Sequence, residues 1–395
     1  MRIAIVQRRY SLDAGGAKRY CVNLCRTLQR WGHSVSVVGE RIDEALAGEV
    51  ALIQVDVNHS SSWSKTRSFE ENVARRLKKE QFDVVLALGR SAHADVFHVT
   101  SRVHARWMQI RYGHPIERAL QRLNPRHRAV LEIERKAFSS NSPTRHIVVQ
   151  SELDRHLLMR LYGVAPDRIR LIRNGVDTTI FNPSASEHAV GVRERWGIRP
   201  TTPLAIFVSA TDFRFKGLGG LIQALRLMRE RDARLLVVGR GPMQQFARIA
   251  RRMGLAGRLI FVGYQRQVER FYATADICVL PTAYEPFPNV ILESMACGVP
   301  VITTATNGGA EIVVDDDTGY VVADHTSVNE IASRMDRFMT LSQTQRDRMS
   351  LRCWETAGQL NLETHAAQMV SLFEEIRDRG VRCQPHSRRI ARLTA

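Results

Sequence analysis

Short apolar runs alternate with amphipathic segments along most of the chain. The predicted strands are Arg2–Val6, Ser34–Val38, Val50–Val55, Val84–Ala87 and His146–Val149 in the first half, and Leu204–Val208, Arg234–Val238, Leu259–Val262, Ile277–Leu280 and Val299–Thr303 in the second. Helical patterns such as Ala17–Trp31 and Gly219–Arg229 lie between them. Because strands that alternate with helices form parallel sheets with right-handed crossovers, the pattern predicts an α/β protein.

The strand series starts again near residue 200, after a polar, proline-containing stretch between Asn182 and Glu187. We place the linker at residues 182–200 and predict two doubly wound, Rossmann-like domains that face each other across a cleft. The first domain covers residues 1–182 and the second 183–360, and a helix at about 360–380 packs back on the first domain. Ligands of such sheets bind beyond the carboxyl ends of the strands, so the cleft is the expected site.

The chain is strongly basic. Its 395 residues include 57 lysines and arginines against 40 acidic residues, a formal net charge of +17. This balance indicates an anionic partner, which is a nucleic acid, an acidic membrane face or a phosphorylated substrate. The basic residues are dispersed and do not form a recognition motif interleaved with aromatic residues, so we expect no nucleic acid.

We expect a cytoplasmic protein whose membrane contact is peripheral. The apolar start, Met1–Val6, is followed at once by Arg8 and Arg9, which does not fit a signal peptide. No run reaches the roughly 18 apolar residues of a membrane span. None of the six cysteines forms a CxxC pair, so we expect small buried thiols and neither a zinc nor a redox site.

Three strand ends carry residues suited to an anion. Gly15 and Gly16 lie in the first strand-to-helix turn, where they allow close backbone approach to a phosphate or simply make the turn. Arg214 and Lys216 follow a predicted strand where a pyrophosphate would lie; the alternative is an exposed basic loop, but their position favours the ligand. At the third strand end Gly308 and Gly309 allow close backbone approach, and Glu311 in the first turn of the next helix fits either a ligand contact or an acid that complements the helix dipole.

The most informative stretch covers residues 284–300, directly after a predicted strand. Pro286 and Pro288 forbid helix before them, so Glu285 lies on a loop at the carboxyl end of the strand. Glu293 lies about one turn inside the next helix, among apolar neighbours that argue against a merely solvated acid. Two carboxylates, which accept paired hydrogen bonds from sugar hydroxyls, therefore flank a helix N-terminus that can bind a phosphate.

These residues resemble glycosyltransferase family 4, a retaining family with the GT-B fold of two facing Rossmann-like domains. The strongest element is the pair Glu285 and Glu293, in a YEPF…LE context with Cys297–Pro300 behind it. The supporting motifs are Gly15-Gly16, Ile172–Asp177 with Phe181 and Pro183, Val238–Pro242, and Gly308-Gly309 with Glu311. The resemblance covers most of the chain.

The resemblance implies a role for each of these residues. Arg214 and Lys216 would bind the donor pyrophosphate, Glu293 the ribose hydroxyls, and Glu285 with the backbone of Phe287 the transferred sugar. The implied donor site comprises Gly15, Gly16, Arg214, Lys216, Arg240, Glu285, Pro286, Phe287, Asn289, Val290 and Glu293. The family uses no metal and no cofactor beside the nucleotide-sugar donor, so cations and the helix terminus would stabilise the leaving diphosphate.

Within the family, the chain resembles lipopolysaccharide-core glycosyltransferases of the heptose glucosyltransferase type. The likeness rests on Asp95–His98 and Thr211–Gly217. The chain departs from that group at Ser101, where an aspartate is common, and at Phe215, where an arginine beside the lysine is expected. These departures bear on the acceptor and on the phosphate contacts.

Residues 98–128 carry the acceptor-side candidates. The resemblance places a histidine near the reacting sugar, so His98 and His104 join Glu285 as catalytic candidates, with His104 preferred. A surface histidine in a basic helix is the open alternative for His104. The segment Arg102–Arg128 mixes arginines with aromatic residues, and either binds an anionic inner leaflet or packs as a charged helix pair.

We expect transfer of a hexose, glucose from UDP-glucose, to a hydroxyl of an anionic lipid-linked glycan such as lipopolysaccharide core. UDP-GlcNAc, UDP-galactose or GDP-mannose as donor, with a polysaccharide or lipid acceptor, remains open. A nucleotide- or nucleic-acid-binding protein without transfer activity is the alternative of a different class. A nicotinamide-dependent oxidoreductase would need a GxGxxG motif in the first turn, which the sequence lacks.

Overall fold

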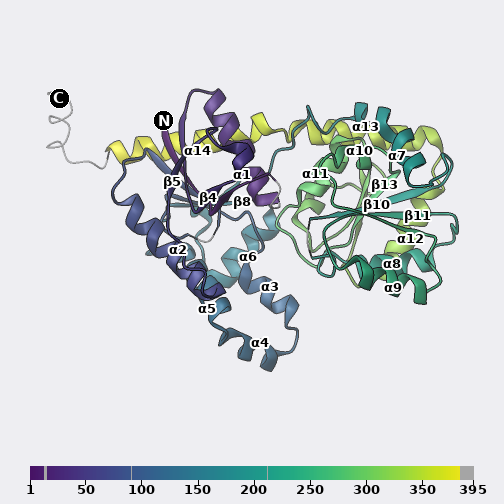
Figure 1. Ribbon diagram of the computed structural model, residues 1–395, viewed down its shortest axis with the longest axis horizontal. Coiled ribbons are helices and arrows are strands. Elements are labelled where there is room, and N and C mark those ends of the chain that lie inside the picture. The colour runs from purple at the N-terminus through teal and green to yellow at the C-terminus, as the bar shows by residue number, and fades with distance from the viewer. Residues whose placement is uncertain (13–15, 90, 211, 383–395) are drawn as a thin grey trace.

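The computed structural model describes residues 1–12, 16–89, 91–210 and 212–382 (Figure 1). The first half forms a seven-stranded parallel sheet in the order β5-β3-β1-β6-β7-β8-β9. Its strands are β1 (Arg2–Val6), β3 (Ser34–Gly39), β5 (Ala51–Gln54), β6 (Val84–Ala87), β7 (Val96–His98), β8 (His146–Val149) and β9 (Ile169–Leu171). A small separate pair joins β2 (Arg9–Tyr10) to β4 (Arg41–Ile42).

The second half forms a six-stranded parallel sheet in the order β12-β11-β10-β13-β14-β15. Its strands are β10 (Leu204–Ser209), β11 (Arg234–Gly239), β12 (Leu259–Gly263), β13 (Ile277–Leu280), β14 (Val301–Thr304) and β15 (Gly319–Val322). Two parallel sheets with crossover helices confirm the predicted α/β fold.

The helices pack around these sheets (Figure 1). Those of the first half are α1 (Gly16–Arg30), α2 (Ser62–Leu77), α3 (His104–Arg111), α4 (Pro115–Arg122), α5 (Pro125–Phe138) and α6 (Glu152–Tyr162). Those that follow are α7 (Ala189–Arg195), α8 (Leu218–Leu227), α9 (Met243–Arg252), α10 (Glu269–Tyr272), α11 (Asn289–Ala296), α12 (Val328–Met339), α13 (Gln343–Gln359) and α14 (Leu362–Arg382). Short 3₁₀ turns are η1 (Glu44–Leu46), η2 (Pro166–Arg168), η3 (Pro183–His188) and η4 (Gly308–Ile312).

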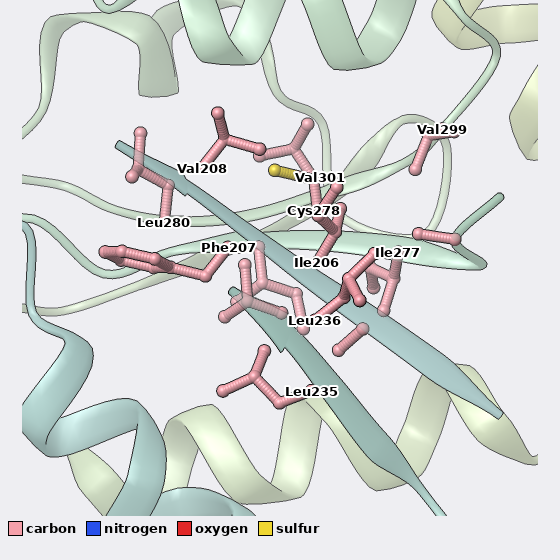
Figure 2. Close-up of a cluster of buried hydrophobic side chains, with 14 of the residues drawn as sticks. Ile206, Phe207, Val208, Leu235, Leu236, Ile277, Cys278, Leu280, Val299 and Val301 are labelled. Atoms are coloured by element: carbon pink, nitrogen blue, oxygen red, sulfur yellow. The ribbon is translucent and has the colours of Figure 1, made fainter. Parts of the chain in front are cut away.

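The central strands are continuous apolar runs because both of their faces are covered. All six residues of β10 are buried, and so are all four of β13. Figure 2 shows how Phe207, Leu236 and Ile277 from three neighbouring strands pack in one cluster. Burial of each such side chain stabilises the folded state by about 1.5–3 kcal/mol. The strand ends that border the site are therefore held in place by the core beneath them.

The strand order of each sheet fixes where a ligand can bind. In the first sheet the chain runs outward from β1 in one direction and from β6 in the other, and in the second sheet it does so from β10 and β13. The carboxyl ends of these strand pairs form a crevice at each switch point. Gly16 follows β1, Lys216 follows β10 and Glu285 follows β13, so all three lie at these crevices.

The last helix returns from the second half to the first. Figure 1 shows α13 and α14 running along one side of the molecule past both sheets. A backbone hydrogen bond fixes the point where the chain crosses between the halves: the amide of Val176 donates to the carbonyl of Leu360 at 2.8 Å. Met369 and Phe373 of α14 are fully buried in the same cluster as Ile3 and other residues of β1, β3 and α1. The first core therefore contains residues from both ends of the chain.

Several elements differ from the sequence-based expectations. The predicted strands Arg2–Val6, Val84–Ala87, His146–Val149 and Ile277–Leu280 have the expected bounds, and other predicted strands shift by one or two residues. Strands β2, β4, β7, β9 and β15 lie outside the predicted set, because each has only two to four residues and no longer apolar run marks it. The expected linker at 182–200 contains η3 and α7.

Candidate active site

A cavity of about 660 Å³ lies between the two halves of the molecule. Residues that line it include Gly16, Tyr20, Arg102, His104, Trp107 and Asn174 from the first half, and Ser209, Asp212, Lys216, Glu285 and Glu293 from the second. The strand ends at both switch points border it, which agrees with the expected cleft.

Most of the residues singled out in the sequence line this one cavity. They are Gly16, His104, Lys216, Glu285, Pro286, Phe287, Asn289, Val290 and Glu293. Of the predicted residues that the structure describes, Arg214, Arg240 and His98 do not line it, and Gly15 lies outside the described residues. Arg214 is exposed, and the guanidinium of Arg240 lies 4.0 Å from the ring centroid of Tyr264, which does line the cavity. The roles of all these residues stay predictions.

A tight turn after β10 positions Lys216. Gly217 has a φ of 86°, and a Cβ there would lie 1.9 Å from the carbonyl oxygen of Pro281, so only glycine fits this close approach. The turn brings Lys216 beside the loop that follows β13. Its Nζ lies 3.1 Å from Oε1 of Glu285.

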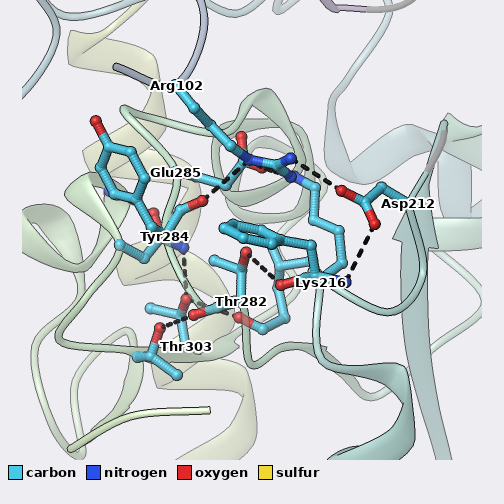
Figure 3. A network of polar contacts seen from close by, with 12 residues as sticks. Arg102, Asp212, Lys216, Thr282, Tyr284, Glu285 and Thr303 are labelled. Carbon is cyan, nitrogen blue, oxygen red and sulfur yellow. Dashed lines mark hydrogen bonds and ion pairs between the residues drawn. The ribbon is translucent and has the colours of Figure 1, made fainter. Parts of the chain in front are cut away.

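Glu285 is bound by two cations (Figure 3). Besides Lys216, the guanidinium of Arg102 donates to Oε1 of Glu285 through Nε at 2.8 Å and through Nη2. Burial alone would raise the pKa of Glu285, but the charges of Lys216 and Arg102 outweigh it and lower the pKa. The carboxylate is therefore charged at neutral pH and lies at the cavity wall.

Glu293 lies in α11, one turn after the helix begins. Its Oε2 accepts a hydrogen bond from the hydroxyl of Tyr272 at 3.0 Å. Burial raises its pKa, and the opposing charge of Arg19, which also lines the cavity, limits the rise. A carboxylate in this position can accept hydrogen bonds from a diol.

Two helix N-termini meet at the cavity, one from each half. Helix α1 begins at Gly16 and α11 at Asn289, and a Cβ on Gly16 would lie 3.7 Å from Nδ2 of Asn289. The Nδ2 of Asn174 donates to Oδ1 of Asn289 at 2.9 Å, which joins the halves beside this point. Because helix N-termini carry partial positive charge, the pair favours an anion between them.

Comparison with known proteins assigns the chain to a family. Residues 14–180 match the family described as Glycosyltransferase Family 4, and residues 202–340 match the one described as Glycosyl transferases group 1. The chain belongs to glycosyltransferase family 4. It is 24% identical to the lipopolysaccharide glucosyltransferase WaaG of Escherichia coli K12 over 337 residues, which cover 83% of this chain and 87% of WaaG.

Solved structures place the fold of this family 4 glycosyltransferase in the GT-B class. The crystal structure of WaaG, a glycosyltransferase involved in lipopolysaccharide biosynthesis, has a TM-score of 0.80 at 22% identity and covers 94% of this chain and 99% of its own. The Anabaena protein HepE in complex with UDP and glucose has a TM-score of 0.73 at 16% identity, with 95% and 100% covered. The predicted family and GT-B fold are therefore confirmed.

The two histidine candidates of this glycosyltransferase lie in different surroundings. His98 is fully buried, its Nε2 lies 3.2 Å from the side-chain nitrogen of Gln150, and burial lowers its pKa well below the usual range. His104 lines the cavity, stacks on Trp107 with ring centroids 5.3 Å apart, and contacts Nδ1 of His127 through its Nε2 at 3.0 Å. The structure therefore places His104, and not His98, where a side chain can reach a ligand in the cavity.

The loop of Glu285 is also anchored across the two halves by a buried hydrogen bond. The hydroxyl of Tyr284 donates to Oδ1 of Asp154 at 2.7 Å and accepts from the amide of Val103 at 3.3 Å. Burial raises the pKa of Asp154 to about 7, against the opposing effect of the Tyr284 hydrogen bond. This contact joins the glycosyltransferase's YEPF loop to α6 and to the start of α3.

The basic segment Arg102–Arg128 divides into a packed part and an exposed part. Met108 of α3 is buried, and Trp107 and Ile110 pack on the core. Three apolar residues in and after α4 are exposed: Ile116 by 66%, Leu120 by 62% and Leu123 by 69%. Over the residues that the structure describes, no helix combines the length and apolar character needed to cross a membrane.

The sequence analysis did not identify three residues at the site: Arg19 and Arg102, which line the cavity, and Tyr272, which is hydrogen-bonded to Glu293. Arg19 follows the glycine turn on α1, and Tyr272 lies in α10, where neither belongs to a recognisable motif. Arg102 was assigned to the basic segment, although its side chain contacts Glu285, which is 183 residues away. The sequence carried one sign of this contact. Phe215 stands where the resemblance predicts an arginine, and the guanidinium of Arg102 lies 4.0 Å from the centroid of its ring.

Proposed function

We propose that the chain is a retaining hexosyltransferase that transfers glucose from UDP-glucose to a hydroxyl of an anionic lipid-linked glycan such as lipopolysaccharide core. One observation carries the donor part: Lys216, Glu285 and Glu293 line a single cavity beside the N-terminus of α11. The glucosyl and lipopolysaccharide parts are supported by the likeness to WaaG, and the UDP part by the fold shared with HepE. Residues 1–182 and 183–360 are the proposed acceptor-side and donor-side domains.

We propose that the loop and helix that follow β13 bind the two ends of the donor separately: one part holds the nucleotide and the other the transferred sugar. Lys216 and the N-terminus of α11 would bind the diphosphate, since both supply positive charge. Glu293 would accept hydrogen bonds from the ribose diol. Glu285 and the backbone of Phe287 would hold the transferred sugar, whose hydroxyls suit a carboxylate acceptor.

The proposed chemistry needs no nucleophilic side chain. The acceptor oxygen attacks the anomeric carbon on the face from which the diphosphate leaves, the bond from that carbon to the diphosphate breaks, and the acceptor proton passes to a diphosphate oxygen. Lys216 and the helix terminus would stabilise the charge that develops on the leaving group, without a metal. His104, which lines the same cavity, would contact the acceptor near this point.

The acceptor part rests on charge and on exposed apolar surface. Ile116, Leu120 and Leu123 are exposed next to the arginines of α4 and α5. Amphipathic surfaces with basic and apolar residues bind anionic lipid surfaces. We therefore propose a cytoplasmic enzyme that contacts the inner face of the membrane peripherally and does not bind nucleic acid.

A panel of UDP-, GDP- and ADP-sugars tests the proposal through thermal shift and donor hydrolysis. We expect UDP-glucose to stabilise the protein and to be hydrolysed slowly, and Glu293→Ala to weaken its binding by about 10–100-fold, since a hydrogen-bonded carboxylate is lost. Glu355→Ala, an exposed acid of α13, is the matched control and should bind like the wild type. Unchanged binding in Glu293→Ala would refute the assignment of the donor site.

The remaining alternatives give other results in the same experiment. Preference for UDP-GlcNAc, UDP-galactose or GDP-mannose would keep the family and change the donor. Nucleotide binding without turnover of any sugar would indicate a binding protein. Retention is tested by proton NMR of the new anomeric centre, where an inverted linkage would exclude the proposed mechanism.

A further inference from the structure

Arg102 belongs to the first half of the chain but is bound by residues of the second. It lies between β7 and α3, and its guanidinium reaches the loop after β13 and the turn after β10 (Figure 3). Besides Glu285, it donates to the carbonyl of Tyr284 at 3.2 Å and to Oδ2 of Asp212 at 3.0 Å. It therefore crosses the cavity at the point where Lys216 and Glu285 meet.

The position of this guanidinium is fixed from several sides. Its central carbon lies over the ring of Phe215, 4.0 Å from the centroid, and Phe215 is itself buried. Asp212 has a φ of 62°, a conformation that residues with a side chain rarely adopt, and its Oδ1 accepts the amide of Phe215 at 3.3 Å. The side chain of Arg102 is only 19% exposed. A guanidinium whose N–H donors are fixed in this way is suited to a ligand with two neighbouring oxygens.

Charge balance indicates which ligand it would take. Arg102 and Lys216 both contact the same carboxylate oxygen, Oε1 of Glu285, so two cations share one acceptor atom. A phosphate group offers more acceptor oxygens and more negative charge than that single atom, and it matches the guanidinium bidentately. A diphosphate would compete with Glu285 for both cations and leave its carboxylate able to accept sugar hydroxyls.

We propose that Arg102 is a phosphate-binding residue of the donor site, supplied from the opposite sheet, and that it contacts the phosphate that carries the sugar. The inference rests on the proposed function. The choice of the distal, β-phosphate follows from its neighbour, because Glu285 is the residue proposed to hold the sugar. Phe215, found where the resemblance predicts an arginine, would then support the cation that takes that arginine's place.

A purely structural role makes a different prediction, and the chain offers a matched control for it. Arg173 also belongs to the first half, and its Nη2 lies 2.8 Å from Oε2 of Glu311 in the second half. Arg173 is not among the residues that line the 660 Å³ cavity in the described part of the chain. If Arg102 only joined the two halves, removing either arginine would have similar consequences.

Calorimetric titration with UDP and UMP tests the inference on the full-length wild type, Arg102→Ala, Arg102→Lys and Arg173→Ala. We expect Arg102→Ala to raise the Kd of UDP by about 10–100-fold and that of UMP by less than about threefold, because the charge-assisted hydrogen bonds are made to the β-phosphate. Arg102→Lys, which keeps the charge but loses the planar fork, should fall between wild type and Arg102→Ala. Arg173→Ala should bind both nucleotides like the wild type.

Each other outcome identifies which statement fails. Equal losses for UDP and UMP, an unchanged Kd of UDP in Arg102→Ala, or an equal loss in Arg173→Ala would overturn the role of Arg102 and leave the proposed function intact. If the wild type binds neither UDP nor the diphosphate of another base selected by the donor panel, the proposed function itself fails. If Arg102→Ala does not fold, the UDP-to-UMP ratio of Arg102→Lys decides: the inference requires a larger loss for UDP.

Discussion

The two walls of the cavity are built in different ways. On the wall from the second half, Lys216 and Glu285 follow strands that are completely buried, and Glu293 is hydrogen-bonded to Tyr272. On the wall from the first half, His104 and Trp107 belong to α3 and their neighbour His127 to α5, and the adjoining α4 has no buried residue. The wall from the second half, called the donor wall after its proposed ligand, has fixed charges for one kind of ligand. The wall from the first half, called the acceptor wall in the same way, offers a broad, partly exposed surface.

This difference separates two kinds of recognition. A nucleotide diphosphate presents the same charges whichever sugar it carries, so it can be bound by groups that hold one another in place. An acceptor varies in size and in its distance from a membrane, so an exposed helix is better suited to it. The comparison yields three experiments, each directed at one wall or at the contact between them.

The largest effect is expected on the donor wall. Glu285→Gln keeps the size of the side chain but removes its charge, so we expect kcat to fall by about 10²–10³-fold, the range found when a group that stabilises a transition state is lost. The Kd of UDP should stay the same or decrease, because Lys216 and Arg102 lose a competing carboxylate. Steady-state transfer and calorimetry measure the two quantities.

The matched control is Glu71→Gln, an exposed acid of α2 in an ion pair with Arg67. It should leave both kcat and the Kd of UDP unchanged. A kcat of Glu285→Gln within a few-fold of the wild type would show that the donor wall does not depend on this charge.

The contact between the walls is expected to depend on pH through Asp154. Its pKa is about 7 in the folded protein and about 3.9 in an unfolded chain, so the folded state holds the proton more tightly. The free energy of unfolding should therefore decrease as the pH rises from about 4 to about 7, by about 1–4 kcal/mol, and change little above that window from this group. Asp154→Asn should remove this part of the slope, as measured by denaturant unfolding at pH 5 and pH 8.

Other carboxylates titrate in the lower part of the same window, so the comparison between variants matters more than the wild-type curve. Asp347→Asn changes an exposed aspartate of α13 and should reproduce the wild-type difference between pH 5 and pH 8. If Asp154→Asn also reproduced it, the buried carboxyl of Asp154 would not be the group that makes the stability depend on pH.

The smallest effect is expected on the acceptor wall. Replacing Leu120 and Leu123 together by glutamate removes apolar area and adds negative charge, so binding to vesicles with anionic phospholipid should weaken by about tenfold or more. Hydrolysis of UDP-glucose should not change, because neither leucine lines the described cavity. Vesicle co-sedimentation measures the first quantity.

Leu351→Glu provides the control, since Leu351 is 55% exposed on α13, in the other half. It should sediment with vesicles like the wild type. Equal weakening by both changes would mean that charge alone, and not the surface of α4, determines membrane binding.

Most of the residues singled out on the second half line the cavity, because their positions follow from local sequence patterns. Continuous apolar runs define β10 and β13, and parallel strands bring their carboxyl ends to one edge of the sheet, where Lys216 and Glu285 are found 3.1 Å apart. Glu293 followed from the prolines that set the start of α11. The acceptor wall could not be derived in this way. Arg102 is indistinguishable by pattern from the other arginines of its segment, and its ion pair depends on how the two halves meet.

The same limit explains the candidates that do not line the cavity. His98 ends a three-residue strand that no pattern revealed, and β7 lies between β6 and β8 in the sheet, so this side chain is fully buried. Arg214 and Lys216 are two positions apart in a turn, and only the second points its charge at Glu285. Spacing identified the turn but not which of the two cations faces the ligand.

The return of α14 to the first half has a consequence for how the protein is made. Strands β1 to β9 end at Leu171, yet the core beneath them lacks Met369, Leu372 and Phe373 until residue 373 has been synthesised. At the usual 5–20 residues per second, about 10–40 seconds separate these events on the ribosome. During that interval the part of the amino-terminal core that α14 covers lacks its partner while the second sheet is already being completed, so the half that emerges first completes its core last.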